Sequence, residues 1–217
     1  MPTDTPLAVD LSQHLLIAMP GMDDMSFARS VIYICEHTSR GALGLCLNKP
    51  LPMSLLDLLS QRGLPLKRDD LRELPLCWGG PVQTERGFML HPKRTGAEEA
   101  EAGSDAIQDD APPTSQDDDA WPYASSLSTA DGLQITTSKD ILEALSYVGG
   151  PTQIFAALGY CAWEKGQLEQ ELGQNSWLTV PAEHSLIFDM PLELRYEGAM
   201  RLLGVSEASL SAQAGHA

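Results

Sequence analysis

The stretch SVIYICEHTSRGALGLCL, residues 30–47, decides the fold of this chain. Its first part, residues 30–35, is rich in β-branched and aromatic residues, and its last part, residues 42–47, is apolar again. The residues between the two runs are polar and include Ser39, Arg40 and Gly41, which are typical of a turn. The pattern therefore predicts two buried strands joined as a β-hairpin.

Similar short runs on both sides of this hairpin predict further strands. They are residues 14–19, 76–78, 87–90, 125–128, 133–136 and 153–160. The second and third runs stand on either side of the turn-like sequence Gly79-Gly80-Pro81-Val82, which favours another hairpin there. The last run is apolar almost throughout, as expected for a strand that is covered on both faces.

Helices are expected between these strands. Ser54 with Asp57 and Thr137 with Asp140 have capping-box spacing, and a leucine-containing segment follows each pair. Two more helices are predicted at residues 167–174 and 192–203. Strands interleaved with helices indicate a mixed α/β fold, with a mixed β-sheet and helices packed on its faces. A small inserted α+β subdomain is compatible with the same pattern.

One segment differs in composition from the rest of the chain. From Lys93 to Tyr123 the sequence is dominated by Asp, Glu, Ala, Ser and Pro, with almost no large apolar residue. Burial of so few apolar groups cannot offset the entropy lost on ordering, so residues 93–123 are predicted to form a disordered acidic insertion. The insertion would lie within a single domain of residues 11–205, followed by a flexible tail at residues 206–217.

The net formal charge of −16 argues against direct binding to nucleic acid. Residues 97–120 of the insertion carry nine acids and no Lys or Arg, so the rest of the chain keeps a net charge of −7 and is still acidic. Every apolar run is far shorter than the roughly twenty residues needed to cross a bilayer. The first ten residues lack the basic and apolar regions of a secretory signal, so a cytoplasmic location without membrane association is expected.

The sequence predicts neither a metal site nor a cofactor. The four cysteines, Cys35, Cys46, Cys77 and Cys161, form no C-x-x-C pair and are expected to be reduced core residues. Cys35 and His37 would share one face of a strand, but two ligands fall short of the four of a structural zinc site. The G-x-S-x-G, Walker, H-E-x-x-H and G-x-G-x-x-G motifs are absent, which argues against the commonest hydrolases and nucleotide enzymes.

Several short segments are more informative as a series than singly. They are Ala18-Met19-Pro20 with Met22 and Asp24, Phe27-Ala28-Arg29-Ser30-Val31-Ile32, His37 with Gly41-Ala42-Leu43-Gly44, Asn48-Lys49-Pro50, Gly79-Gly80-Pro81-Val82, Leu90-His91, Ser138-Lys139-Asp140, and Gly159-Tyr160-Cys161-Ala162-Trp163 with Gly166-Gln167-Leu168-Glu169. In this order, from about Leu15 to Gly204, the series resembles the YqgE/AlgH family of bacterial proteins. The resemblance implies an α/β fold in a cytoplasmic protein and brings no established activity with it, although many members carry the label of transcriptional regulator. Ala162 stands where the family pattern Gly-Tyr-x-Gly-Trp has its second glycine.

Residues 159–169 are the most site-like segment, because a predicted strand ends at Tyr160 and a helix is expected from Gln167. Ligands of α/β sheets bind at the carboxyl ends of strands, and free N–H groups at a helix start attract anions. With the turn at residues 79–81, the candidate ligand-binding residues are Gly79, Gly80, Pro81, Gly159, Tyr160, Cys161, Trp163 and Gln167. Alternatively, the glycines mark tight packing and the aromatic residues fill the core. Arg29 is expected to be the structural partner of a carboxylate.

Three classes of function remain open. A cytoplasmic regulatory or interaction protein, with an indirect effect on transcription, ranks first because no catalytic set assembles. Its partner would be a protein or a small molecule. A small-molecule-binding protein or enzyme that uses residues 79–81 and 159–167 ranks second. A direct DNA-binding regulator ranks last, because the sequence has no helix-turn-helix pattern.

Overall fold

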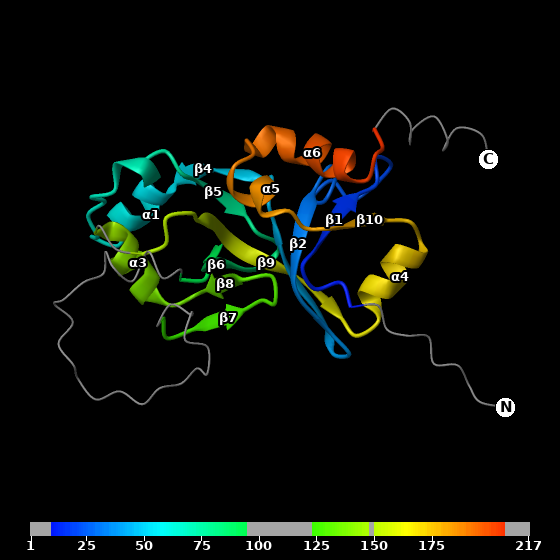
Figure 1. Ribbon diagram of the computed structural model, residues 1–217, viewed down its shortest axis with the longest axis horizontal. Helices are drawn as coiled ribbons and strands as arrows, with labels where there is room; N and C mark the ends of the chain where they lie inside the picture. Colours follow the sequence, from blue (N-terminus) through cyan, green and yellow to red (C-terminus); the bar gives the residue numbers. More distant parts are fainter. Residues whose placement is uncertain (1–9, 95–122, 148–149, 207–217) are drawn as a thin grey trace. The chain divides into compact units, whose positions relative to one another are not determined.

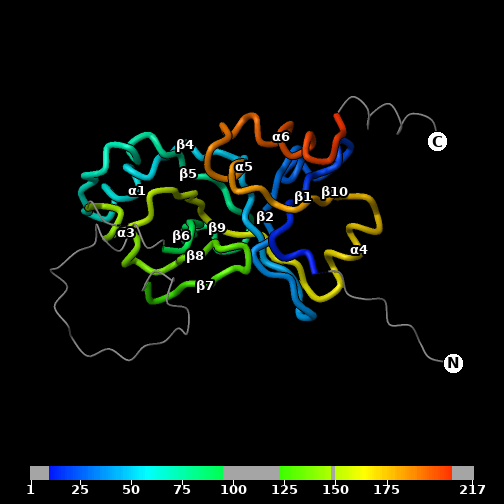
Figure 2. The backbone as a smooth tube through the Cα atoms, viewed as in Figure 1, coloured from blue at the N-terminus to red at the C-terminus, as the bar shows by residue number. Residues whose placement is uncertain are grey.

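The structure is a computed structural model that describes residues 10–94, 123–147 and 150–206. Nearly all of the acidic insertion predicted at residues 93–123, and of the tail predicted at residues 206–217, lies outside these ranges. Figures 1 and 2 show the path of the backbone, which divides into two compact units. The first unit contains residues 1–50, 77–85 and 157–217, and the second contains residues 51–76 and 86–156.

An antiparallel sheet forms the centre of the first unit. Its strands stand in the order β10, β1, β2, β3, β9. Their bounds are β1 His14–Ala18, β2 Val31–Thr38, β3 Gly41–Cys46, β9 Phe155–Glu164 and β10 Trp177–Pro181. The predicted hairpin at residues 30–47 is confirmed, because β2 and β3 pair from Ile32 and Cys46 to the turn between Thr38 and Gly41.

Helices cover this sheet and explain why its strands are apolar on both faces. They are α4 Gln167–Gly173, α5 His184–Phe188, the 3-10 turn η2 Leu192–Leu194 and α6 Arg195–Leu202. Leu168 of α4 belongs to a buried cluster with Leu16 and Ile32. Leu15 and Ile17 point to the other face by strand alternation and are also fully buried. The single helix predicted at residues 192–203 is η2 followed by α6.

α6 is fixed to the sheet by two buried side chains at its start. The Tyr196 hydroxyl donates a hydrogen bond of 2.7 Å to the carbonyl oxygen of Ala18 at the end of β1. The Arg195 guanidinium donates to the carbonyl oxygens of Leu47 at 2.6 Å and Met190 at 3.0 Å. These bonds join the start of α6 to the ends of β1 and β3 and to the segment after α5.

The remaining elements lie wholly or partly in the second unit. They are β4 Pro50–Ser54, α1 Leu55–Gln61, the 3-10 turn η1 Asp69–Leu71, β5 Pro75–Trp78, β6 Val82–Pro92, β7 Ser126–Ser128, β8 Leu133–Thr136 and α3 Lys139–Ser146. Within this unit, β8 lies between β6 and β7 and is antiparallel to both. The α1 capping box is confirmed, because the Ser54 hydroxyl accepts from the Asp57 amide and the Asp57 carboxylate accepts from the Ser54 amide.

Two predicted details are wrong. The strands on either side of residues 79–82 are not hairpin partners, because β5 pairs with β4 and, in parallel, with β9 through Cys77 and Trp78. This parallel pair makes the fold mixed, as the sequence predicts. In addition, Ser138 rather than Thr137 is the N-cap of α3. The Ser138 hydroxyl donates to the Asp140 carboxylate and so does not cap the helix backbone.

Candidate functional site

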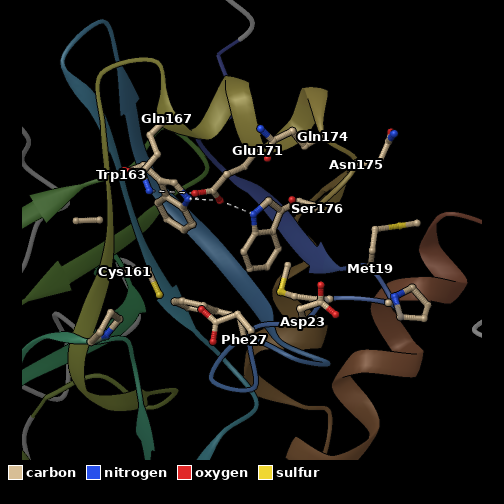
Figure 3. A pocket seen from close by; sticks show the side chains of 17 residues that line it. Met19, Asp23, Phe27, Cys161, Trp163, Gln167, Glu171, Gln174, Asn175 and Ser176 are labelled. Atoms are coloured by element: carbon tan, nitrogen blue, oxygen red, sulfur yellow. Dashed lines mark hydrogen bonds between the residues drawn. The ribbon is translucent and has the colours of Figure 1, made fainter.

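A cavity of about 880 Å³ opens in the first unit between the segment after β1, strand β9, helix α4 and the start of β10. Figure 3 shows its side chains from close by. Its lining contains aromatic residues, methionines and carboxylates, together with small and amide residues. The lining residues are Met19, Pro20, Gly21, Met22, Asp23, Asp24, Phe27, Pro81, Cys161, Ala162, Trp163, Gln167, Glu171, Gln174, Asn175, Ser176 and Trp177.

The turn from β9 into α4 places two polar side chains on the cavity side of the helix. Gly166 adopts a left-handed conformation with φ of 78°, which glycine tolerates and which reverses the chain before Gln167. The Gln167 side-chain oxygen accepts from the Glu164 amide at 2.9 Å and extends the reversal. Gln167 and Glu171 are four residues apart and therefore share one helix face, where Gln167 Nε2 donates to Glu171 Oε1 at 3.0 Å.

The Glu171 carboxylate holds two indole rings in place (Figure 3). Its Oε2 atom accepts from Nε1 of Trp163 at 3.0 Å and from Nε1 of Trp177 at 2.8 Å. Trp163 comes from β9 and Trp177 from β10, so a single side chain of α4 links both edges of this sheet segment. Because hydrogen bonds to an ionised acceptor are stronger than neutral ones, these bonds fix the orientation of both rings before any ligand arrives.

Aromatic rings form one wall of the cavity. Phe27 meets Trp177 edge to face, with ring centroids 5.8 Å apart and planes at 75°. Trp163 and Trp177 are arranged similarly, at 6.3 Å and 80°. Both indoles are almost fully buried, whereas Phe27 is half-buried and so presents part of its ring to the open space. Edge-to-face contacts of this kind are favourable geometries for aromatic pairs.

A compact turn after β1 carries Phe27 and supplies the acidic rim. The Asp24 carboxylate accepts from the Ser26 amide at 2.8 Å, and the Asp24 carbonyl accepts from the amides of Phe27 and Ala28. Asp23, its neighbour, is exposed and makes no hydrogen bond within the described part of the chain. One carboxylate of the pair thus shapes the turn, and the other is available at the cavity mouth.

Asn48 and Lys49 stabilise the end of this turn through hydrogen bonds to its backbone. The Asn48 side chain accepts from the Val31 amide at 2.9 Å and donates to the Arg29 carbonyl at 2.8 Å. The Lys49 ammonium donates to the Ala28 carbonyl at 2.7 Å. The Arg29 guanidinium lies 4.6 Å from the centroid of the Tyr196 ring, which is a cation–π contact.

The glycines of the candidate set pack backbone against backbone. A Cβ atom at Gly79 would overlap the carbonyl of Gly159, and one at Gly80 would overlap the backbone of Tyr160 and Cys161. Gly159 itself has φ of 74°. The Gly79 carbonyl accepts from the Cys46 amide at 2.9 Å, and the Gly79 amide donates to the Leu158 carbonyl at 2.8 Å. The interpretation of these glycines as marks of tight packing therefore agrees with the geometry.

Cys161 is buried, although the strand end predicted at Tyr160 would have left its thiol accessible. Strand β9 continues to Glu164, so Cys161 lies inside it and only 1% of its surface is exposed. Its Sγ atom donates to the Gly79 carbonyl oxygen at 3.2 Å. Burial, followed by the nearby thiols of Cys46 and Cys35, raises the pKa of Cys161 well above its usual range. The thiol is therefore in the protonated form near neutral pH.

Cys35 and His37 do not form a ligand pair. The Cys35 thiol points to the Tyr33 carbonyl at 3.7 Å. Nδ1 of His37 accepts from the Leu11 amide at 3.1 Å, and Nε2 lies 3.2 Å from Glu169 of α4. Among the residues that the structure describes, no group of three or more His, Cys, Asp and Glu side chains could hold a metal ion.

Half of the candidate residues lie at the cavity. Pro81, Cys161, Trp163 and Gln167 line it, whereas the other four form the close backbone contact between residues 79–80 and 159–160 and are not part of its lining. Sequence reasoning did not include Glu171, Trp177, Asp23 and Phe27 in the site. Part of the signal was present, because Phe27 belongs to the motif series and Glu171 is four residues after Gln167. Only the fold shows that Trp177 meets both of them.

The fold and cavity define an α/β protein in which an antiparallel sheet carries an aromatic, acid-rimmed pocket. A family model described as AlgH-like matches residues 15–208, and the chain belongs to this family. Proteins named UPF0301 from Polaromonas and from Acidovorax sp. are each 50% identical to it over 217 residues, covering 100% of both chains.

Solved structures agree with this assignment. The solution structure of the AlgH protein from Pseudomonas aeruginosa is 38% identical, covers 100% of both chains and superposes with a TM-score of 0.69. A crystal structure of a protein from Corynebacterium diphtheriae shares the fold, with a TM-score of 0.60 at 20% identity over 88% of this chain and 86% of the other. Across the described ranges, no helix is both long and apolar enough to cross a membrane.

Proposed function

We propose that this protein is a ligand-binding protein whose cavity in the first unit takes a small organic molecule, and that a regulatory or interaction role follows from this binding. The observation that carries the proposal is the cavity itself. Its volume of about 880 Å³ lies within the range of small-molecule sites, and its walls combine apolar surface with a few convergent polar groups.

The fixed position of the polar groups supports binding. Glu171 is held by three hydrogen bonds from Gln167, Trp163 and Trp177, so little side-chain freedom remains to be lost when a ligand enters. The close backbone contacts of Gly79 and Gly80, next to the lining residues Pro81 and Cys161, similarly restrict backbone movement. A pre-formed site of this kind binds more tightly than one that must be ordered by its ligand.

Direct binding to DNA is the less favoured alternative. The chain carries a net formal charge of −16, and the described residues around the cavity include neither Lys nor Arg. Without clustered cations, few counterions are released from the phosphate backbone and affinity stays low. A promoter fragment should therefore be retained at low salt at most, and tight retention at physiological salt would favour the DNA-binding alternative.

The proposal is tested by screening the purified full chain against a chemically diverse library of cationic, neutral and anionic compounds. Binding is measured as a thermal shift and as perturbation of indole N–H signals in NMR spectra. Compounds that bind at the cavity should lose affinity in a Gly21→Trp variant, because Gly21 lines the cavity and has open space around its Cβ position.

Gly173→Trp is the matched control, because Gly173 also has open space but lies outside the cavity. It should bind the same compounds as the unmodified chain. Compounds that bind both variants equally would place binding elsewhere on the molecule. If no compound of the library changes the Tm or the indole N–H signals of the chain, the proposal is contradicted.

A further inference from the structure

We propose that the ligand of this cavity is an organic cation, namely an ammonium or quaternary ammonium group on an apolar or aromatic body. The inference rests on the proposed ligand-binding function and adds the charge and chemical class of the ligand. It is carried by the combination of three carboxylates with an aromatic wall in one cavity.

The carboxylates give the cavity a negative charge that no cationic side chain of its described lining neutralises. Asp23, Asp24 and Glu171 all line it, while the described lining residues include no Lys, Arg or His. The three negative charges attract a cation that enters this space and repel an anion. Phosphorylated and carboxylated ligands are therefore disfavoured.

The Glu171 carboxylate can still accept a hydrogen bond from a ligand. An ionised carboxylate offers about four acceptor positions. Trp163 and Trp177 occupy two of them on Oε2, and Gln167 occupies one on Oε1. Within the described part of the chain the fourth position, on Oε1, has no donor, so an ammonium N–H could donate there. Asp23 at the mouth similarly has no hydrogen-bond donor among the described residues.

The aromatic wall supplies the second attraction for a cation. Phe27, Trp163 and Trp177 meet edge to face at centroid distances of 5.8 and 6.3 Å, and all three line the cavity. Ring faces attract cations electrostatically, most strongly for Trp, and they also accommodate an apolar body. Met19 and Met22 add unbranched, polarisable side chains that adapt to the shape of such a body.

Charge is tested with probes that share one phenyl body. Benzyltrimethylammonium and 2-phenylethylamine are cations, 2-phenylethanol is neutral and 3-phenylpropanoate is an anion. Titration of the full chain, followed by saturation-transfer NMR and calorimetry, should show both cations binding about tenfold more tightly than the alcohol, and the anion not at all. Cation affinity should fall as salt is added.

Two carboxylate variants locate the effect. Glu171→Gln keeps an oxygen for the two indole N–H groups but removes the charge. It should lower the affinity for both cations about tenfold and change the affinity for the alcohol little. Asp23→Asn, which breaks no hydrogen bond in the described structure, should weaken the cations about threefold and keeps the test valid if Glu171→Gln fails to fold. Glu193→Gln, an exposed carboxylate outside the cavity, is the matched control and should leave affinity unchanged.

The outcomes separate this inference from the function on which it rests. If the alcohol or the anion binds as tightly as the cations, and Gly21→Trp abolishes that binding, the cavity is a ligand site and the cation assignment is wrong. If none of the four probes binds, the cation assignment is likewise wrong, while the library screen decides the ligand-binding function on its own. Cation binding that Glu193→Gln weakens as much as Glu171→Gln would reflect the general charge of the protein and overturn the assignment to this site.

Discussion

Among the glycines that the structure describes, Gly80 leaves the least room for a Cβ atom. A Cβ atom there would overlap the backbone of Tyr160 and Cys161, which cannot move aside as a flexible side chain could. Gly80→Ala should therefore destabilise the protein by about 3 kcal/mol or more, since forced overlap in a packed interior costs at least the usual penalty for overpacking. The free energy of unfolding in guanidinium measures the effect.

Gly173→Ala provides the contrast for this substitution. Gly173 ends α4 and has nothing within 4 Å of its Cβ position, so alanine should be neutral or should stabilise the helix by up to about 1 kcal/mol. Equal stability of the Gly80→Ala and Gly173→Ala proteins would show that the close approach of residues 79–80 to β9 is not required.

The Cys161 thiol should react slowly with alkylating reagents, although Cys161 is among the residues that line the cavity. Reaction with iodoacetamide requires the thiolate, and burial raises the pKa of Cys161 far above neutrality. The same cause raises the pKa of Cys77 to about 12. With limiting reagent near pH 7, peptide mass mapping should therefore find Cys161 modified no faster than Cys35, Cys46 or Cys77. Rapid, selective labelling of Cys161 in the folded protein would contradict the buried position, and unfolding in guanidinium should expose all four.

The start of α1 depends on a local element of sequence. The Ser54 hydroxyl accepts from the Asp57 amide at 3.2 Å, and the Asp57 carboxylate accepts from the Ser54 amide at 2.8 Å. Ser54→Ala should cost about 1 kcal/mol and lower Tm by about 2–4 °C in a chain of this size. Ser60→Ala, an exposed position in the same helix, should change Tm much less.

The effect of Ser54→Ala should also depend on pH. Hydrogen bonds from the Ser54 backbone and hydroxyl lower the pKa of Asp57 below its ordinary 3.8. Because the folded-state pKa is depressed, the stabilisation is present above the ordinary value and is lost as pH falls through the lowered one. The difference in Tm between the two proteins should thus shrink as pH drops below the ordinary carboxyl range, and a constant difference would show that the carboxylate plays no part.

Elements with strong local signals were predictable from the sequence, and those that depend on distant contacts were not. The hairpin of β2 and β3 and the capped helix α1 follow from apolar runs, turn residues and caps that lie close together in the chain. In contrast, β10 pairs with β1 more than 150 residues away, and the parallel partner of β5 is β9. No local pattern in the residues of β10 or β5 specifies these partners, because tertiary pairing decides them.

At the scale of the whole chain, the sequence indicated some residues of the cavity and missed others. Residues 79–81 and 159–167 were candidate ligand-binding segments, and of the eight candidate residues Pro81, Cys161, Trp163 and Gln167 line the cavity. The carboxylate that organises the cavity, Glu171, was missed because its role depends on two indoles that come from different strands. A helical glutamate is otherwise typical of a solvated surface.

The acidic segment at residues 97–120 should be dispensable for folding. It carries nine carboxylates, no Lys or Arg and almost no large apolar residue, so it has little to contribute to a core. The strands that it connects, β6 and β7, lie on either side of β8, so their separation is about two strand spacings, or roughly 10 Å, across the sheet. After deletion, residues 93–96 and 121–125 remain as a linker, and these nine residues reach about 30 Å when extended.

Deletion of residues 97–120 should therefore leave Tm within about 2 °C of that of the full chain, measured by calorimetry at several salt concentrations. A second variant, with the nine acids of this segment replaced by Asn and Gln at unchanged length, separates charge from chain length. Removal of self-repulsion should raise Tm slightly in both variants at low salt, and the difference should vanish at high salt, where exposed charges are screened. A fall of more than about 10 °C on deletion, with the neutralised variant unaffected, would show that the segment packs against the folded chain.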